Sequence, residues 1–201
     1  MMGTLAATWE GFVGVESEAA ALHRGDPEAL AAMLTRYQNR LYRFLLRLTR
    51  QPAEAEDLFQ QTWLRVAERH RQYDPRHSFE AWLFTVARNL AMDHLRRARP
   101  QSLEVASDDG ITQAEHLPSA GPTALERLLA RERAERVLAA LQDLPVPYRE
   151  ILVLRFEEEM KLEEIARVVD APLSTVKTRL ARGLERMRRH LASAASEGNL
   201  A

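Results

Sequence analysis

Cysteine is absent from this chain of 201 residues. Disulfide bonds, thiolate metal sites and catalytic thiols are therefore excluded. Long hydrophobic runs are absent as well: the apolar stretches are far shorter than the ~20 residues needed to span a bilayer, and no segment has the pattern of a signal peptide. Together these absences predict a cytoplasmic protein that does not insert into membranes.

Recognisable catalytic motifs are also lacking. The 6 histidines are scattered without a His-Glu-x-x-His pair, and no cysteine is available to complete a metal site. The chain contains no glycine-rich phosphate loop and no Gly-x-Ser-x-Gly nucleophile turn. The sequence therefore indicates neither an enzyme nor a bound metal or cofactor.

Hydrophobic residues make up 46% of the chain and recur at three- and four-residue spacing, which predicts an all-α protein. Helix-starting signals occur at Asp26-Pro27, at Ser78 and at a capping box from Thr123 to Glu126. The long helices expected from these signals cover residues 27–50, 53–71, 79–98 and 123–142. A row of arginines on the first helix is interpreted as a solvated face, with a specific role left open: Arg36, Arg40, Arg43, Arg47 and Arg50.

The C-terminal part is organised around two helical patterns separated by a short break. Residues 162–169 form a short amphipathic segment, residues 170–172 include a proline, and residues 173–191 form a basic helix. Helix, tight turn and basic helix make the helix-turn-helix pattern. The apolar stripe expected on the basic helix consists of Val176, Leu180, Leu184, Met187 and Leu191. Its opposite face of Arg, Ser and Thr suits the major groove of DNA, although a solvated helix in any bundle is the alternative.

Four segments around this helix pair resemble region four, the promoter-binding C-terminal domain of bacterial sigma factors. They are Leu144-Pro145, Tyr148-Arg-Glu-Ile-Leu152, Leu162-Glu-Glu-Ile-Ala166 and Ser174-Thr-Val-Lys-Thr-Arg179. The compact form that they resemble is the extracytoplasmic-function, or ECF, group.

Two positions depart from the family pattern, which usually has Gly in place of Ser174 and a Ser or Thr cap in place of Lys161. The helix that starts at residue 162 is therefore expected to fray.

Two further segments resemble region two of the same family. They are Ala55-Glu-Asp-Leu-Phe-Gln-Gln-Thr-Trp63 and Phe79-Glu-Ala-Trp-Leu-Phe-Thr-Val-Ala-Arg-Asn-Leu-Ala-Met-Asp-His-Leu-Arg-Arg97. The resemblance implies a tail at 1–16, region two at 17–100, a flexible acidic linker at 101–122 and region four at 123–201. The expected fold is thus two all-α domains, a three- or four-helix bundle and a helix-turn-helix domain, joined by the linker.

The function implied by the resemblance is that of a promoter-specificity subunit. Such a subunit binds core RNA polymerase, recognises and melts the minus-ten element of promoter DNA, and reads the minus-thirty-five element. An anti-sigma factor is the expected regulatory partner. The residues implied in polymerase binding are Asp57, Gln60, Gln61, Thr62 and Arg65. Those implied at the minus-ten element are Tyr73, Asn89, Asp93, Arg96 and Arg97. Those implied at the minus-thirty-five element are Ser174, Thr175, Lys177, Thr178, Arg179, Arg182 and Arg186.

Two other functional classes remain open from the residues alone. One is a helix-turn-helix regulator that binds DNA tightly without polymerase. The other is a sigma mimic that binds an anti-sigma factor without directing transcription. Transcription with core polymerase on a promoter library distinguishes all three.

Overall fold

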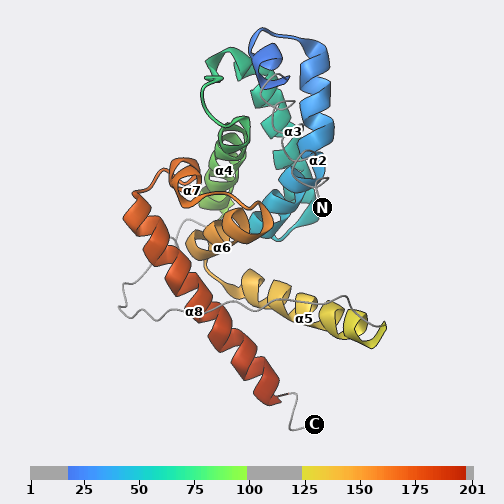
Figure 1. The fold of residues 1–201 in the computed structure, drawn as a ribbon, viewed down its shortest axis with the longest axis vertical. Helices are drawn as coiled ribbons and strands as arrows, with labels where there is room; N and C mark the ends of the chain where they lie inside the picture. Colours follow the sequence, from blue (N-terminus) through green and yellow to red (C-terminus); the bar gives the residue numbers. More distant parts are fainter. Residues whose placement is uncertain (1–17, 99–123, 198–201) are drawn as a thin grey trace, which may run out of the picture.

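The computed structural model describes residues 18–98 and 124–197, and helices dominate both ranges (Figure 1). No strand occurs in the described ranges, which agrees with the all-α prediction. Residues 18–23 form a short helical segment. The elements that follow are α2 (Pro27–Thr49), α3 (Pro52–Arg69), the 3-10 turn η1 (His70–Gln72), α4 (Phe79–Ala98), α5 (Ala124–Asp143), α6 (Val146–Leu152), the π-helical turn η2 (Val153–Glu157), α7 (Leu162–Val168) and α8 (Leu173–Glu197). The tail at 1–16 and the linker at 101–122 lie outside the described residues.

Two of the predicted caps hold their helix starts, and the third, Thr123, lies outside the described residues. The side chain of Asp26 accepts a hydrogen bond from the backbone N–H of Glu28 at 2.9 Å, and Ser78 Oγ accepts one from the N–H of Ala81 at 3.2 Å. Each cap satisfies one of the four N–H groups that a helix start leaves without an internal partner.

Fraying at the start of α7 was expected because a lysine occupies the cap position. The structure instead shows the carboxylate of Glu164 accepting a hydrogen bond from the backbone N–H of Lys161 at 3.0 Å. This is the return half of a capping box, in which the third helical residue reaches back to the cap. Glu164 therefore stabilises the helix start that Lys161 cannot cap with its own side chain.

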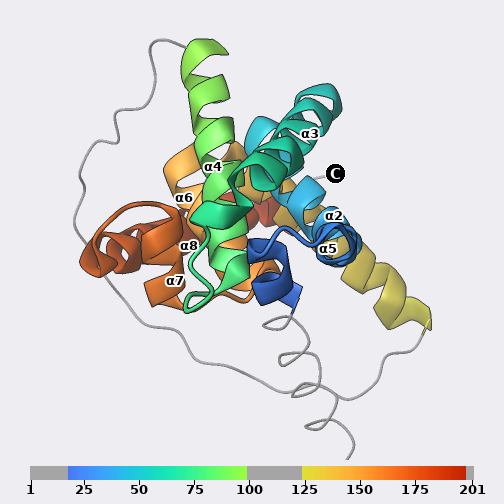
Figure 2. The same cartoon turned by 90° about the horizontal axis from the view of Figure 1, so that it is seen from above.

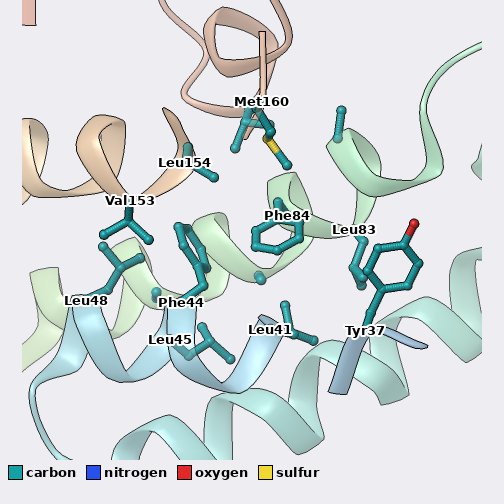
Figure 3. Close-up of a cluster of buried hydrophobic side chains, with 14 of the residues drawn as sticks. Tyr37, Leu41, Phe44, Leu45, Leu48, Leu83, Phe84, Val153, Leu154 and Met160 are labelled. Atoms are coloured by element: carbon teal, nitrogen blue, oxygen red, sulfur yellow. The ribbon is translucent and has the colours of Figure 1, made fainter. Parts of the chain in front are cut away.

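Helices α2, α3 and α4 pack into one bundle, which we call the N-terminal unit (residues 18–98). Its core is apolar, and Figure 3 shows Leu41, Phe44 and Leu45 of α2 facing Leu83 and Phe84 of α4. The rings of Phe44 and Phe84 meet edge to face, with their centroids 5.1 Å apart. Edge-to-face packing is a favoured aromatic geometry.

Helices α5 to α8 form the C-terminal unit (residues 124–197), in which α8 crosses α6 and α7. Val176 at the start of α8 is fully buried, but Leu184 is 38% exposed. Two turns further along, the buried position is Gly183, where an added Cβ would lie 3.2 Å from Leu152 Cδ1. The buried stripe therefore passes through Gly183 rather than Leu184, and a side chain at position 183 would require Leu152 to shift.

The two units are in direct contact. Helix α2 packs against α6 and η2, and α4 packs against α7. Figure 2, the view from above, shows α4 between α3 and the α7–α8 pair. Figure 3 shows Val153, Leu154 and Met160 of the C-terminal unit over the same apolar cluster that contains Phe44 and Phe84. The two domains expected from the sequence thus share one apolar core within the described residues.

Candidate nucleic-acid interface and partner surfaces

The N-terminal half of α8 presents a polar face next to α6. A hollow of about 290 Å³ is lined by Tyr148, Ser174, Thr175, Thr178, Arg179 and Arg182. Lys177 lies beside this hollow and is exposed. Six of the seven residues predicted to contact the minus-thirty-five element thus lie together on the first turns of α8, the part of a recognition helix that enters the major groove.

The hydroxyl group of Thr178 is already engaged within α8. It donates a hydrogen bond to the carbonyl oxygen of Ser174 at 3.0 Å. The hydroxyl oxygen keeps its lone pairs, so the exposed side chain of Thr178 presents a hydrogen-bond acceptor and a methyl group. An acceptor and a methyl group can contact the amino group of a cytosine or adenine and the methyl group of a thymine.

Arg186 differs in position from the other predicted residues. Its guanidinium carbon lies 5.1 Å from the centroid of the Tyr148 ring, in a cation–π contact between α8 and α6. The structure therefore assigns Arg186 a packing contact in addition to its predicted contact with the minus-thirty-five element. Tyr148 was not predicted at this site, because an aromatic residue in the apolar period of α6 looks like any other core residue.

The predicted polymerase surface lies along α3. Asp57, Gln60 and Gln61 are exposed, and Arg65 is half-buried at the edge of the same face. Thr62, in contrast, is fully buried, and its hydroxyl donates a hydrogen bond to the carbonyl oxygen of Leu58 at 2.7 Å. The prediction of Thr62 as a surface residue is wrong, because its position on α3 points into the bundle.

Leu64 is a surface residue that sequence reasoning missed. It is 64% exposed and lies one turn after Gln60 and Gln61 on the same side of α3. The signal that could have revealed it is an apolar residue in the polar phase of the helix. Exposed apolar side chains surrounded by polar ones are typical centres of protein interfaces.

The structure places the residues predicted at the minus-ten element in two different environments. Asn89, Asp93, Arg96 and Arg97 are exposed on the C-terminal half of α4. Arg96 pairs with Asp93 at 3.0 Å, and Arg97 Nε donates a hydrogen bond to the carbonyl oxygen of Asp93 at 3.1 Å. These four side chains form one polar surface that is open to a partner.

Tyr73 does not belong to that surface. It is only 3% exposed, and its hydroxyl donates a hydrogen bond to the carbonyl oxygen of His77 at 2.7 Å. Its ring packs against Phe79 and Trp82, with centroids 5.5 and 5.4 Å away. The prediction that Tyr73 contacts the minus-ten element does not fit this burial, because the ring anchors the loop to α4.

Both units match known protein families. The model of Sigma-70 region 2 matches residues 33–101, and that of Sigma-70 region 4 matches residues 134–187. The ECF RNA polymerase sigma factor SigW of Bacillus subtilis is 30% identical over 171 residues, which cover 84% of this chain and 91% of that protein. The chain belongs to the ECF group of sigma factors. The RNA polymerase sigma factor CarQ of Myxococcus xanthus is 34% identical to this sigma factor over 164 residues, with 82% and 90% of the two chains covered.

Solved structures share the fold of this sigma factor. The structure of CnrH in complex with the cytosolic domain of CnrY has a TM-score of 0.64 at 22% identity, covering 89% of this chain and 97% of that chain. The sigma factor RpoE in complex with the anti-sigma factor NepR, from Bartonella quintana, has a TM-score of 0.60 at 22% identity, covering 81% and 96%. Among the described helices of this sigma factor, none is long and apolar enough to cross a membrane.

Proposed function

We propose that this sigma factor docks on core RNA polymerase through α3, captures the melted minus-ten strand with α4 and reads the minus-thirty-five element with α8. The observation that carries the proposal is the hydroxyl- and arginine-lined face at the start of α8, placed on a helix-turn-helix scaffold. Residues 17–100 and 123–201 are the two working regions in this proposal, and residues 101–122 connect them. The protein acts as a non-enzymatic subunit in the cytoplasm, where the polymerase is.

The α3 surface supports the polymerase contact. Leu64 supplies an apolar centre, and Asp57, Gln60, Gln61 and Arg65 supply its polar surroundings. The double change of Asp57 and Gln61 to alanine removes two exposed side chains, so the fold is retained while affinity for core polymerase falls by roughly tenfold or more, the usual effect of losing a central interface contact.

A matched control tests whether that loss is specific to α3. Gln38 and Asn39 are two exposed amide side chains on α2, outside the predicted polymerase surface. Changing both to alanine removes a similar amount of polar surface, so the affinity for core polymerase should stay unchanged. An equal loss from both double variants would contradict the assignment of α3 as the docking surface.

Transcription in vitro tests the whole function. Purified protein and core polymerase, given a library of promoter sequences, start transcripts from a defined pair of elements. Tight DNA binding without any need for polymerase would indicate an ordinary helix-turn-helix regulator. Polymerase-independent binding to an anti-sigma factor without transcripts would indicate a mimic.

Control by an anti-sigma factor is the regulatory part of the proposal. The similar fold of RpoE was solved with the anti-sigma factor NepR, and that of CnrH was solved with the cytosolic domain of CnrY. Affinity purification of the tagged chain from its own cells tests this part. An anti-sigma protein retained before induction and lost afterwards supports it, and a chain that stays unbound and active under all growth conditions contradicts it.

A further inference from the structure

Tyr148 is the residue of α6 that lines the hollow at the start of α8. Only 1% of the residue is exposed. The guanidinium carbon of Arg186 lies 5.1 Å from the centroid of its ring, and a Cβ added at Gly183 would lie 3.5 Å from its Cβ. Since a ring face and the base of the side chain are both covered by α8, the hydroxyl group is the part of Tyr148 that is left to face the hollow.

The hydroxyl group of Tyr148 forms no hydrogen bond with any of the described residues. A buried tyrosine normally has a partner for this group, because an unpaired polar group away from water is unfavourable. Tyr73, which is similarly buried at 3% exposed, donates its hydroxyl hydrogen to the carbonyl oxygen of His77 at 2.7 Å. The partner of the Tyr148 hydroxyl must therefore come from a ligand in the hollow.

The start of α8 brings further hydrogen-bond donors to the same place. The N–H group of Val176 donates to the carbonyl oxygen of Pro172 at 3.1 Å, so the N–H groups of Ser174 and Thr175 precede the internal hydrogen bonds of the helix. Such N–H groups and the positive end of the helix dipole attract anions. The side chains of Ser174 and Thr175 add two hydroxyl groups to the lining.

The charge and the size of the hollow both suit a phosphate group. Arg179 and Arg182 line it, and among the described residues no acidic side chain does so. Its volume is about 290 Å³. This is several times the ~30 Å³ that a water molecule occupies in the liquid, so a tetrahedral phosphate group has room beside water. Arginines, hydroxyl groups and helix starts are the groups with which proteins bind phosphate oxygens.

The hollow lies on the flank of α8 and not on its most exposed face. Thr178 is exposed, whereas Thr175 and Arg179, one turn apart, are half-buried beside α6. A recognition helix in the major groove has base edges in front of it and the sugar-phosphate chains along its flanks. The part of promoter DNA that can enter the hollow is therefore a phosphate and not a base.

We propose that the hollow is a phosphate-binding site in which the hydroxyl group of Tyr148 donates a hydrogen bond to the phosphate and Arg179 supplies the charge. The identity of this phosphate as one of the minus-thirty-five element rests on the proposed function, and a free phosphate ion has the same chemistry. A contact with a phosphate fixes where α8 lies along the groove without favouring a base sequence. Tyr148 is thus a DNA-binding residue contributed by α6.

The variant Tyr148→Phe removes the donor and keeps the ring beside Arg186, so the fold is retained. The affinity of the holoenzyme for promoter DNA should fall about tenfold, the usual loss when a donor to a charged acceptor is removed. The loss should be equal for all variants of the minus-thirty-five element, because no base contact changes. The dependence of affinity on salt should match wild type, because no charge is removed.

A second tyrosine provides the matched control. Tyr42 is half-buried on α2, outside the surfaces proposed for polymerase and DNA. Tyr42→Phe removes the same hydroxyl group there, so affinity and its salt dependence should both stay unchanged. Equal losses from the two variants, or a Tyr148→Phe protein that binds promoter DNA like wild type, would overturn the role of Tyr148 in binding DNA.

Methylphosphonate substitution identifies the phosphate on the DNA. Each phosphate of the minus-thirty-five element is replaced in turn by the uncharged methylphosphonate, and the affinity of the holoenzyme is measured. At the phosphate that occupies the hollow, the losses from methylphosphonate and from Tyr148→Phe should not add, because both remove the same contact. Losses that add fully at every position would exclude a DNA phosphate from the hollow.

Calorimetric titration of the free full-length chain with inorganic phosphate separates the two sources of phosphate. Binding that Tyr148→Phe weakens, without coupling to any DNA phosphate, assigns the hollow to a free phosphate ion. The absence of both coupling and phosphate binding overturns the site, even if the protein starts transcription. If wild-type holoenzyme uses no promoter, the proposed function fails, and the phosphate titration alone decides whether the site exists.

Discussion

The carboxyl group of Glu150 lies in the contact between the units with only 1% of the residue exposed. It accepts hydrogen bonds from Arg88 Nε at 3.0 Å and Nη2 at 3.4 Å. Burial raises the pKa of this carboxyl group, and the charges of Arg88 and Arg179 oppose the rise. Ionised Glu150 is therefore a cost to the folded state that its arginine partners only partly offset.

This raised pKa gives a testable pH dependence. A carboxyl group whose pKa is higher in the folded than in the unfolded state stabilises fully below its unfolded pKa, about 4.3, and loses that contribution as pH rises through the folded value. Wild type should therefore gain stability relative to Glu150→Gln as pH falls from 7 towards 5. Urea denaturation of both proteins at several pH values measures the difference. A difference that is constant with pH would show that Glu150 keeps an ordinary pKa.

Arg182 and Arg179 both line the hollow at the start of α8, but different roles are expected of them. Arg182 is one turn from Thr178 on the outward face, so Arg182→Ala should lose roughly 1–3 kcal/mol on the correct minus-thirty-five element and relax the choice of base. Arg179 is expected nearer to phosphates, so Arg179→Ala should weaken all sequences alike and reduce the salt slope by about one. Titration of the holoenzyme on promoter variants at several salt concentrations distinguishes the two. If Arg179→Ala changes the order of affinities among the promoter variants and Arg182→Ala does not, the side of α8 assigned to the bases is wrong.

The helices themselves could be predicted because their signals are local. Asp26, Ser78 and the apolar spacing of α2, α3 and α4 act within a few residues along the chain, and the structure has these helices where they were expected. The site residues came from the resemblance to the sigma family, and the same periodicity places most of them on exposed faces. The errors at Thr62 and Tyr73 have another cause, since each is buried by its rotation around a helix or by a loop folding back.

The contact between the units could not be predicted from the sequence. Arg40 and Glu158 are 118 residues apart, and an arginine that pairs over such a distance has the same local pattern as a solvated one. Periodicity shows that a helix has a charged face but not what covers it. Tyr148 and Gly183 were missed for the same reason: their roles depend on which element lies opposite.

The crossing of α6 and α8 depends on Gly183. A Cβ there would meet Leu152 Cδ1 at 3.2 Å and the Cβ of Tyr148 at 3.5 Å. Gly183→Val should therefore force the helices apart and cost about 1–3 kcal/mol, the usual penalty of overpacking, despite removing a helix-interior glycine. Leu184→Val on the exposed neighbour is the matched control and should stay within about 0.5 kcal/mol. If thermal denaturation shows the same loss of stability for both variants, the buried stripe of α8 runs through Leu184 as the sequence predicted.

The whole chain should unfold as one cooperative body, because the two units share a core. Leu154 belongs to the C-terminal unit and is fully buried beside Phe44 and Phe84 of the N-terminal unit. Both tryptophans among the described residues, Trp63 and Trp82, are in the N-terminal unit. Tryptophan fluorescence therefore reports mainly on the unit that does not contain Leu154.

Leu154→Ala tests this coupling directly. Truncating a buried leucine costs about 2–5 kcal/mol through lost apolar contact and the cavity left behind. In a shared core that loss should lower the urea midpoint reported by tryptophan fluorescence together with the midpoint reported by helical circular dichroism. In independently folding units the fluorescence midpoint would stay at its wild-type value while circular dichroism splits into two transitions. Ala31→Leu, an exposed site at the opposite end of α2 from Arg47, should leave both midpoints unchanged, because a surface substitution there removes no packing.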